Sequence, residues 1–199
     1  MTIIPPSARP PVDYAARLFT VADLAALPSE LPSGPVLWEL DNGRLVAMPP
    51  PGDIHGAAES NLAAALKVQG EWKGLGKARS GEVGVILWRN PDRVVGADAV
   101  FVANASLPIR RSAEGYLETI PDLVVEVRSK NDTSPEVQRK VEDYLHAGVR
   151  LVWVADPQRG TVTAYRRDTP PQVFIEDDTL TAEDIIPGFA LLVRDALQE

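Results

Sequence analysis

The chain has 199 residues, of which 45% are hydrophobic and 24% are charged, and these proportions are typical of a folded domain with a sizeable core. Its formal net charge of −8 argues against a broad basic surface for nucleic acid or acidic membranes, although it does not exclude a local basic groove. The absence of cysteine excludes disulfides and thiolate metal sites, and no apolar run reaches the roughly 18 residues that a membrane-spanning helix needs.

The N-terminal segment is rich in proline and has neither a basic start nor a long apolar stretch, so it lacks the pattern of a signal peptide. We therefore expect a cytoplasmic protein with a proline-rich arm over residues 1–19 and a single domain over residues 20–199. Thr20 and Asp23 have the spacing of a capping box, which predicts a short helix that continues through Leu27.

A β-hairpin is expected next along the chain. Two apolar segments, 36–40 and 44–48, flank Asn42 and Gly43, and this dipeptide adopts the positive φ angles that tight hairpin turns require. The sequence therefore predicts two antiparallel strands near the N-terminus.

A long helix is predicted over residues 54–69, with Asp53 as its N-cap. Ala58, Leu62 and Leu66 recur at helical spacing, so they should form the buried face of this helix.

The rest of the chain alternates apolar strands with a second long helix, which begins at Ser134 and Pro135 and ends before Gly148. The predicted strands cover residues 82–88, 96–103, 123–128, 150–155 and 161–166. Because a strand–helix–strand unit over 123–155 favours a parallel pair, we expect an α/β fold at the border of α+β, with a mixed sheet and helices on both faces.

The segment 121–129 is the most informative one, because it combines an apolar strand with carboxylates. Strand side chains alternate between faces, so Leu123, Val125 and Val127 should point one way and Asp122, Val124, Glu126 and Arg128 the other. A carboxylate in the middle of a buried strand is costly unless a partner or a metal offsets the loss of hydration. Glu126 is therefore either half of a buried ion pair or a site residue.

Asp98 is the candidate partner of Glu126 in a metal site. If its strand lies next to 123–128, both carboxylates can face the same side near the strand ends. Two adjacent carboxylates repel each other, and a divalent cation such as Mg²⁺ removes that repulsion. The alternative is that Asp98 ends a strand and that Glu126 pairs with Arg128 or another cation.

Lys140 is a second candidate, because it could project from its helix over the strand that carries Glu126. There it could orient a water molecule or stabilise negative charge at phosphorus. The alternative is a solvated lysine that pairs with Glu136 one turn earlier.

For three further residues the sequence allows two interpretations each. Glu39, in the hairpin, is either an exposed glutamate or a third metal ligand. His55 is either a helix-start residue or a phosphate-binding one, and the helix dipole is expected to lower its pKa. Asp122 either supports the site or merely begins its strand.

Taken in order, several segments resemble the putative restriction endonuclease family of the PD-(D/E)XK nuclease superfamily, long catalogued as a domain of unknown function. The matching segments are residues 38–46, 49–51 with His55, 98–102, 121–129, 140–149 and 152–157. The resemblance covers about residues 20–193. It implies a restriction-endonuclease-like mixed β-sheet flanked by helices, with the acid pair on adjacent strands.

Carried over residue by residue, the resemblance makes Asp98 and Glu126 the two motif acids and the ligands of Mg²⁺ or Mn²⁺. Two positions depart from the pattern: Ala97 replaces the usual proline, and Arg128 replaces the usual lysine. Arginine is a poor base because it does not deprotonate. Lys140, on the following helix, is the expected replacement, with Lys130 as a nearer substitute.

The implied activity is metal-assisted hydrolysis of DNA phosphodiester bonds, by a homodimer because two-fold symmetry suits duplex cleavage. A local basic rim is expected from Lys73, Lys77, Arg79, Arg110 and Arg111. The alternative is a catalytically inactive protein that uses the same scaffold to bind nucleic acid or protein.

Overall fold

A computed structural model describes residues 17–48, 50–130 and 132–198. Most of the expected proline-rich arm lies outside these residues. Its last three positions, 17–19, lie against the hairpin, where the Phe19 amide donates to the Gly43 carbonyl at 2.8 Å. None of the described helices is both long enough and apolar enough to cross a membrane.

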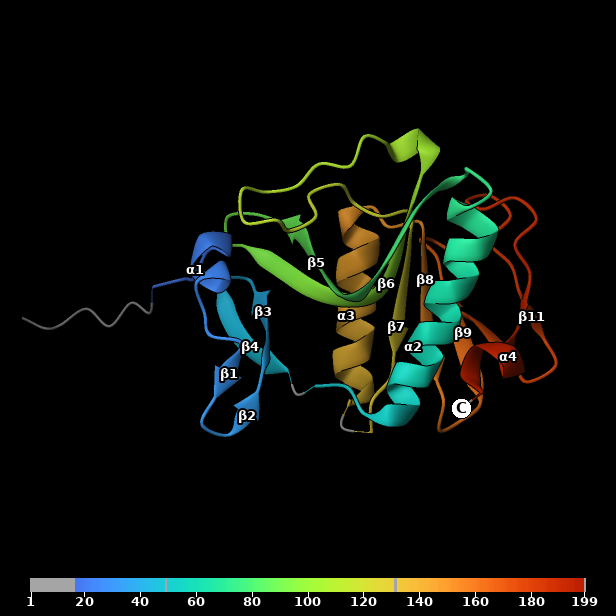
Figure 1. Ribbon diagram of the computed structural model, residues 1–199, viewed down its shortest axis with the longest axis horizontal. Helices are drawn as coiled ribbons and strands as arrows, with labels where there is room; N and C mark the ends of the chain where they lie inside the picture. Colours follow the sequence, from blue (N-terminus) through green and yellow to red (C-terminus); the bar gives the residue numbers. More distant parts are fainter. Residues whose placement is uncertain (1–16, 49, 131, 199) are drawn as a thin grey trace, which may run out of the picture.

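The described chain contains short and long helices and many strands (Figure 1). The helices are α1 (Val21–Ala25), α2 (Asp53–Leu66), α3 (Ser134–Ala147) and α4 (Val193–Leu197), with a π-helical turn η1 (Lys67–Glu71) and a 3-10 turn η2 (Asn104–Ser106). The strands are β1 (Glu30–Leu31), β2 (Gly34–Pro35), β3 (Leu37–Asp41), β4 (Arg44–Met48), β5 (Gly76–Trp88), β6 (Arg93–Ala103), β7 (Leu123–Val127), β8 (Leu151–Asp156), β9 (Thr161–Tyr165), β10 (Gln172–Ile175), β11 (Thr179–Leu180) and β12 (Leu191–Leu192).

The main sheet has eight strands in the order β10-β9-β8-β7-β6-β3-β4, with β5 also paired to β6. The pair β7–β8 is parallel and its neighbours are antiparallel, so the predicted mixed sheet and parallel pair are both confirmed. The predicted hairpin is confirmed as β3 and β4, and Asn42 and Gly43 in its turn have φ angles of 50° and 77°.

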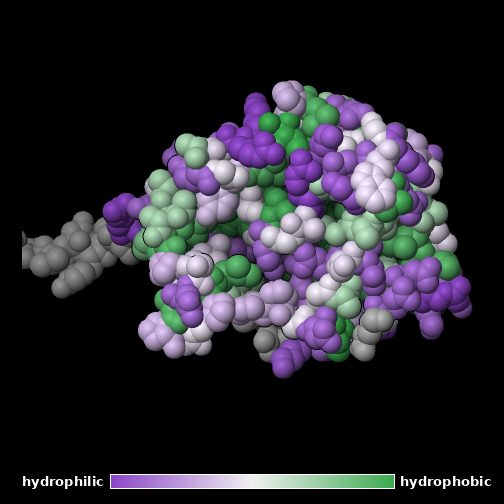
Figure 2. Space-filling model, in the orientation of Figure 1, coloured by the Kyte–Doolittle hydropathy of each residue, from purple (hydrophilic) through white to green (hydrophobic). Residues whose placement is uncertain are grey.

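Helices cover both faces of the sheet, as the sequence predicted. On one face α2 and α4 pack against Phe101, Leu123 and Val125, while on the other α3 packs against Val124 and Val152 (Figure 1). The predicted alternation of β7 is therefore confirmed. Hydrophilic residues dominate the face drawn in Figure 2, with hydrophobic residues visible between them.

The helix ends agree with the predicted capping residues in all but one case. Thr20 caps α1 through the predicted capping box with Asp23, and Gly148 ends α3 in the left-handed conformation at φ 112°. The N-cap of α2 is Gly52 rather than Asp53, which is instead the first helical residue. An acid there still favours the helix, because its charge lies beside the unsatisfied amides of the first turn.

Strand β5 differs most from its prediction, since it begins at Gly76 rather than Glu82. Its first half contains glycine and serine, which disfavour strands locally, but pairing with β6 from Gly76–Ala103 onward overrides that preference. The register shifts between Ser80 and Val83, where Gly81 and Glu82 have positive φ angles, so this point is a β-bulge.

Arg93 connects the hairpin to the rest of the fold. Its side chain, only 6% exposed, lies 2.8 Å from Asp143 on α3 and 3.4 Å from Glu39 on β3. It also donates to the Leu40 carbonyl at 3.0 Å. This one guanidinium therefore links β3, β6 and α3 inside the protein.

We expect Gly76→Ala to lower the free energy of unfolding by about 1–3 kcal/mol, because overpacking at a site that cannot relax is destabilising. A Cβ at Gly76 would lie 2.3 Å from the Val102 carbonyl oxygen and 2.6 Å from Phe101 Cζ. Gly56 is the matched control, since its Cβ would meet nothing within 4 Å, and Gly56→Ala in α2 should stabilise by up to about 1 kcal/mol. Urea denaturation measures both, and equal stability of the two variants would contradict the close approach at Gly76.

Arg93→Met should destabilise the protein by about 3–5 kcal/mol, because Asp143 loses its cation and Glu39 loses one of its two, while Lys140 remains beside it. Arg139→Met is the control: this arginine is 62% exposed, lies 3.6 Å from Asp41, and should change the free energy of unfolding by less than about 1 kcal/mol. Thermal and urea unfolding compare the two variants. A similar small effect of both would show that the Arg93 contacts do not hold the hairpin.

Candidate functional site

Lys140 lies between two acids, the buried Glu39 and the half-buried Glu126. Its Nζ atom is 2.8 Å from Glu126 Oε2 and 3.1 Å from Glu39 Oε1, and it donates to the Gly96 carbonyl at 2.8 Å. The alternative prediction, a solvated lysine paired with Glu136, is wrong, because Glu136 instead closes the capping box with Thr133. The projection of Lys140 over the strand that carries Glu126 is confirmed.

Glu126 is held from α3 by two groups. Lys140 binds one carboxylate oxygen, and the Tyr144 hydroxyl donates to Oε1 at 2.5 Å. Burial raises the pKa of Glu126 above its usual range, and Lys140 only partly opposes this effect. Glu126 is therefore a member of a buried ion pair, and Arg128, the other predicted partner, instead binds Asp156 at 3.2 Å.

Glu39 is buried, so the expectation of an exposed hairpin glutamate is wrong. One oxygen accepts the Gly96 amide at 3.0 Å and lies 3.1 Å from Lys140, while the other is 3.4 Å from Arg93. Its face of β3 is covered because the hairpin joins the main sheet beside β6, and this packing is not visible in the local sequence.

Asp98 lies on the strand next to Glu126, as predicted, but it contacts a different helix. The last pair of the β6–β7 ladder is Ala99–Val125, and just beyond it the Val127 amide donates to Asp98 Oδ2 at 2.5 Å. The other oxygen is 3.4 Å from His55 Nε2 on α2. The carboxylate therefore occupies the opening between the two strands instead of facing α3 beside Lys140.

His55 and Glu59 extend the cluster from α2. Possible ligand atoms of His55, Glu59 and Asp98 all lie within 4.8 Å of one another, and the Gly81 amide donates to Glu59 at 2.9 Å. Our sequence analysis did not identify Glu59. Its signal was the spacing of four residues from His55, which places both side chains on one helix face.

The charge on His55 differs from the expectation. Burial alone lowers the pKa of His55, but the hydrogen bond and negative charge of Asp98, with the charges of Glu82 and Glu59, outweigh it and raise the pKa. The predicted lowering by the helix dipole is therefore wrong. The neighbouring acids dominate because they are formal charges at short range, whereas the dipole amounts to roughly half a charge.

Glu82 is a second acid that sequence reasoning missed. It is at the β5 bulge with a φ of 54°, and its Oε2 atom would lie 2.8 Å from a Cβ placed on Gly96. Burial and the charge of Asp98 raise the pKa of Glu82 to about 7. No local pattern marks Glu82, because only the bulge turns its side chain toward the site.

Two other candidates lie away from the cluster. Asp122 is at the opposite end of β7 from Glu126, about 13 Å away along the strand, where it accepts the Ala103 amide and lies 3.4 Å from Arg150. It therefore supports the strand end and not the site. Lys130 is exposed and forms no ion pair among the described residues.

The cluster has the composition of a divalent-cation site. Its acids are Glu39, Glu59, Glu82, Asp98 and Glu126. Lys140 and a protonated His55 cannot balance them, and burial also raises the pKa of Glu59. His55 Nδ1 is buried without a hydrogen-bond partner in the described structure. A cation among Asp98, His55 and Glu59 would relieve the repulsion.

Comparisons with known proteins agree with this geometry. A model of the family described as "Uma2: Putative restriction endonuclease" matches residues 22–194. The fold is similar to the crystal structure of a putative nuclease of DUF820 from Anabaena variabilis ATCC 29413, with a TM-score of 0.72, 20% identity, and coverage of 90% of this chain and 97% of that one. No curated protein matches. Because the family model spans most of its length, the chain belongs to the putative restriction endonuclease family.

Proposed function

We propose that the protein is a metal-dependent nuclease that hydrolyses DNA phosphodiester bonds. The observation that carries this proposal is the meeting of Asp98 from β6 with His55 and Glu59 from α2, next to the strand β7, whose Glu126 binds Lys140 of α3. Family membership supports the same reaction class.

Asp98 and Glu126 are the proposed metal ligands. Asp98 lies in one group with His55 and Glu59, which are further donors from α2, and Glu126 lies on the neighbouring strand β7. Carboxylate oxygens suit Mg²⁺, and an imidazole beside them also suits Mn²⁺. When bound, the cation lowers the pKa of a coordinated water molecule and stabilises charge on the phosphate oxygens. Val127 and Gly81 fix Asp98 and Glu59 through their amides, so these carboxylates are oriented before any ligand arrives.

Lys140 acts as a fixed positive charge and not as a base. Although burial alone lowers its pKa, Glu126 and Glu39 outweigh that effect and raise the pKa of Lys140 above its usual range. A lysine that keeps its proton cannot accept one. Because the Lys140 ammonium already contacts Glu126, Glu39 and the Gly96 carbonyl, it contributes its positive charge to the site and would bind a water or a phosphate oxygen only in exchange for one of these contacts.

The alternative is an inactive member of the family that binds nucleic acid or protein. In that case the Lys140–Glu126 contact at 2.8 Å would serve only to stabilise the fold. A hydrolase for another phosphate ester would instead enclose its substrate in a small closed pocket. A homodimer stays a prediction from the two-fold symmetry of duplex DNA, and sedimentation velocity tests it.

Glu126→Gln and Asp98→Asn should each reduce DNA cleavage by about 10²-fold or more, because each removes a negative charge that holds the cation. Plasmid and single-stranded DNA are assayed with Mg²⁺ and with Mn²⁺, and electron paramagnetic resonance of Mn²⁺ measures binding without cleavage. Glu142→Gln is the control, because Glu142 is exposed on the same helix as Lys140. Unchanged activity of Glu126→Gln would refute the mechanism, and no cleavage by wild type with either metal would favour the binding protein.

Lys140→Gln should reduce cleavage by about 10²–10³-fold, whereas Lys130→Gln should keep wild-type activity. The first variant removes a buried charge that contacts two acids, and the second removes an exposed one. Because Lys140→Gln will also lower the melting temperature, rates are compared at a temperature where circular dichroism shows both variants folded. The opposite result, with activity lost only in Lys130→Gln, would assign the lysine role to Lys130.

A further inference from the structure

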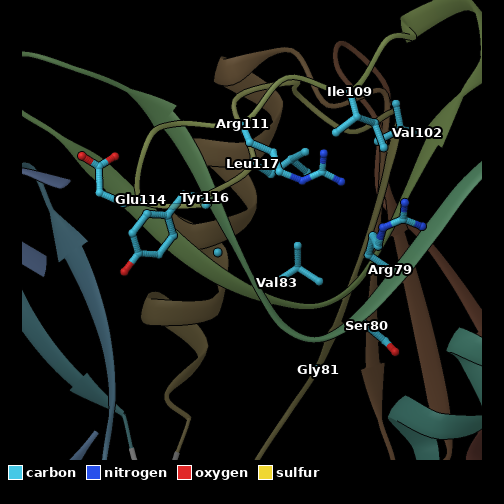
Figure 3. Close-up of a pocket in the computed structure, with 12 residues that line it drawn as sticks. Arg79, Ser80, Gly81, Val83, Val102, Ile109, Arg111, Glu114, Tyr116 and Leu117 are labelled. Atoms are coloured by element: carbon cyan, nitrogen blue, oxygen red, sulfur yellow. The ribbon is translucent and has the colours of Figure 1, made fainter. Parts of the chain in front are cut away.

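A pocket of about 460 Å³ opens beside the acid cluster, between β5 and the loop over residues 109–117. Its volume lies in the range of sites that bind small organic ligands. Charged, aromatic and aliphatic residues line it, among them Arg79, Val83, Ile109, Arg111, Tyr116 and Leu117 (Figure 3).

Two arginines bring guanidinium groups to the pocket, and of the two only Arg111 lacks an acidic partner among the described residues. In Figure 3 the guanidinium groups of Arg79 and Arg111 lie on the same side of the pocket, and Glu114 points away from them. Arg111 forms no ion pair among the described residues, and Arg79 lies 3.5 Å from Glu71 at the surface. In a chain with a net charge of −8, an uncompensated arginine in a pocket indicates an anionic ligand.

Apolar side chains form another part of the wall. Val83, Ile109 and Leu117 line the pocket together with Tyr116. The Tyr116 ring lies directly over Gly84, since a Cβ there would be 2.4 Å from its Cδ1 atom. A ligand with one anionic group and one flat apolar part fits these walls better than a free inorganic ion does.

The pocket shares a wall with the acid cluster. Gly81 lines the pocket, and its amide donates to Glu59 at 2.9 Å. The β5 bulge between Ser80 and Val83 therefore separates the pocket from the acid cluster. A DNA strand bound at one of the two sites can extend into the other.

We propose that this pocket, the Arg79–Arg111 pocket, binds one unstacked nucleotide of a DNA strand next to the phosphodiester at the acid cluster. The inference rests on the proposed nuclease function. Guanidinium groups bind the phosphate, and the apolar walls contact the sugar and base. A base that stays stacked in a duplex cannot enter a pocket, so the substrate is single-stranded or locally unpaired DNA.

Binding is tested without metal, so that no cleavage occurs. A 5′-phosphorylated thymidine dinucleotide is titrated in EDTA into wild type, Arg111→Gln and Arg110→Gln, and nuclear magnetic resonance or calorimetry measures the affinity. Arg111→Gln should weaken binding about tenfold or more, because a charge-assisted hydrogen bond to phosphate is lost. Arg110→Gln is the matched control: the sequence predicted Arg110 in one basic rim with Arg79 and Arg111, but in the structure its side chain lines a different hollow, so the variant removes the same charge outside the pocket.

A second measurement compares single-stranded with fully paired DNA of the same sequence. Wild type should bind the single strand more tightly in EDTA, and Arg111→Gln should lose that preference while Arg110→Gln keeps it. Equal affinities of Arg111→Gln and wild type for the dinucleotide, or equal binding of both DNA forms by wild type, would overturn the proposal. Failure of the nuclease function would appear separately, as absence of cleavage with Mg²⁺ and Mn²⁺ while the dinucleotide still binds.

Discussion

The contacts of one ammonium group hold the candidate site together. Lys140 reaches from α3 to Glu126 on β7, Glu39 on β3 and the Gly96 carbonyl on β6. Burying either carboxylate without a cation would cost free energy, and for Glu39 this cost would oppose the packing of the hairpin against the sheet. The shared cation offsets both charges at once, so the N-terminal hairpin and the central strands meet at one point. Arg93 contacts the other carboxylate oxygen of Glu39.

The sheet divides the site into two halves. On the α3 side, Lys140 neutralises Glu126, and on the α2 side His55 and Glu59 face Asp98. Asp98 belongs to both halves, because its carboxylate fills the opening where the β6–β7 ladder ends. The proposed metal site therefore lies at the place where two strands separate.

The sequence was sufficient for much of the fold, because the decisive signals were local. Asn42 and Gly43 specified the hairpin turn, and the alternation around Glu126 specified which side chains of β7 share a face. Local sequence patterns could not predict that Glu39 is buried or that Glu82 turns toward the site. Both depend on strands far apart in sequence, the first on hairpin docking and the second on a bulge whose register β6 imposes. Sequence distance also separates Asp98 from α2, so its contact with His55 was not predicted.

The proposed catalytic role of Lys140 and its observed structural role together have an evolutionary consequence. A lineage that abandoned catalysis could replace His55 with little harm to the fold, since its ring leaves one nitrogen without a partner. It could not replace Lys140 so easily, because two interior acids would lose their counter-charge. Selection for a stable fold alone would therefore retain Lys140 after the catalytic activity had been lost. Among descendants of such a protein, a retained His55 would indicate an active ancestor, whereas a retained Lys140 would indicate only that the fold has been kept.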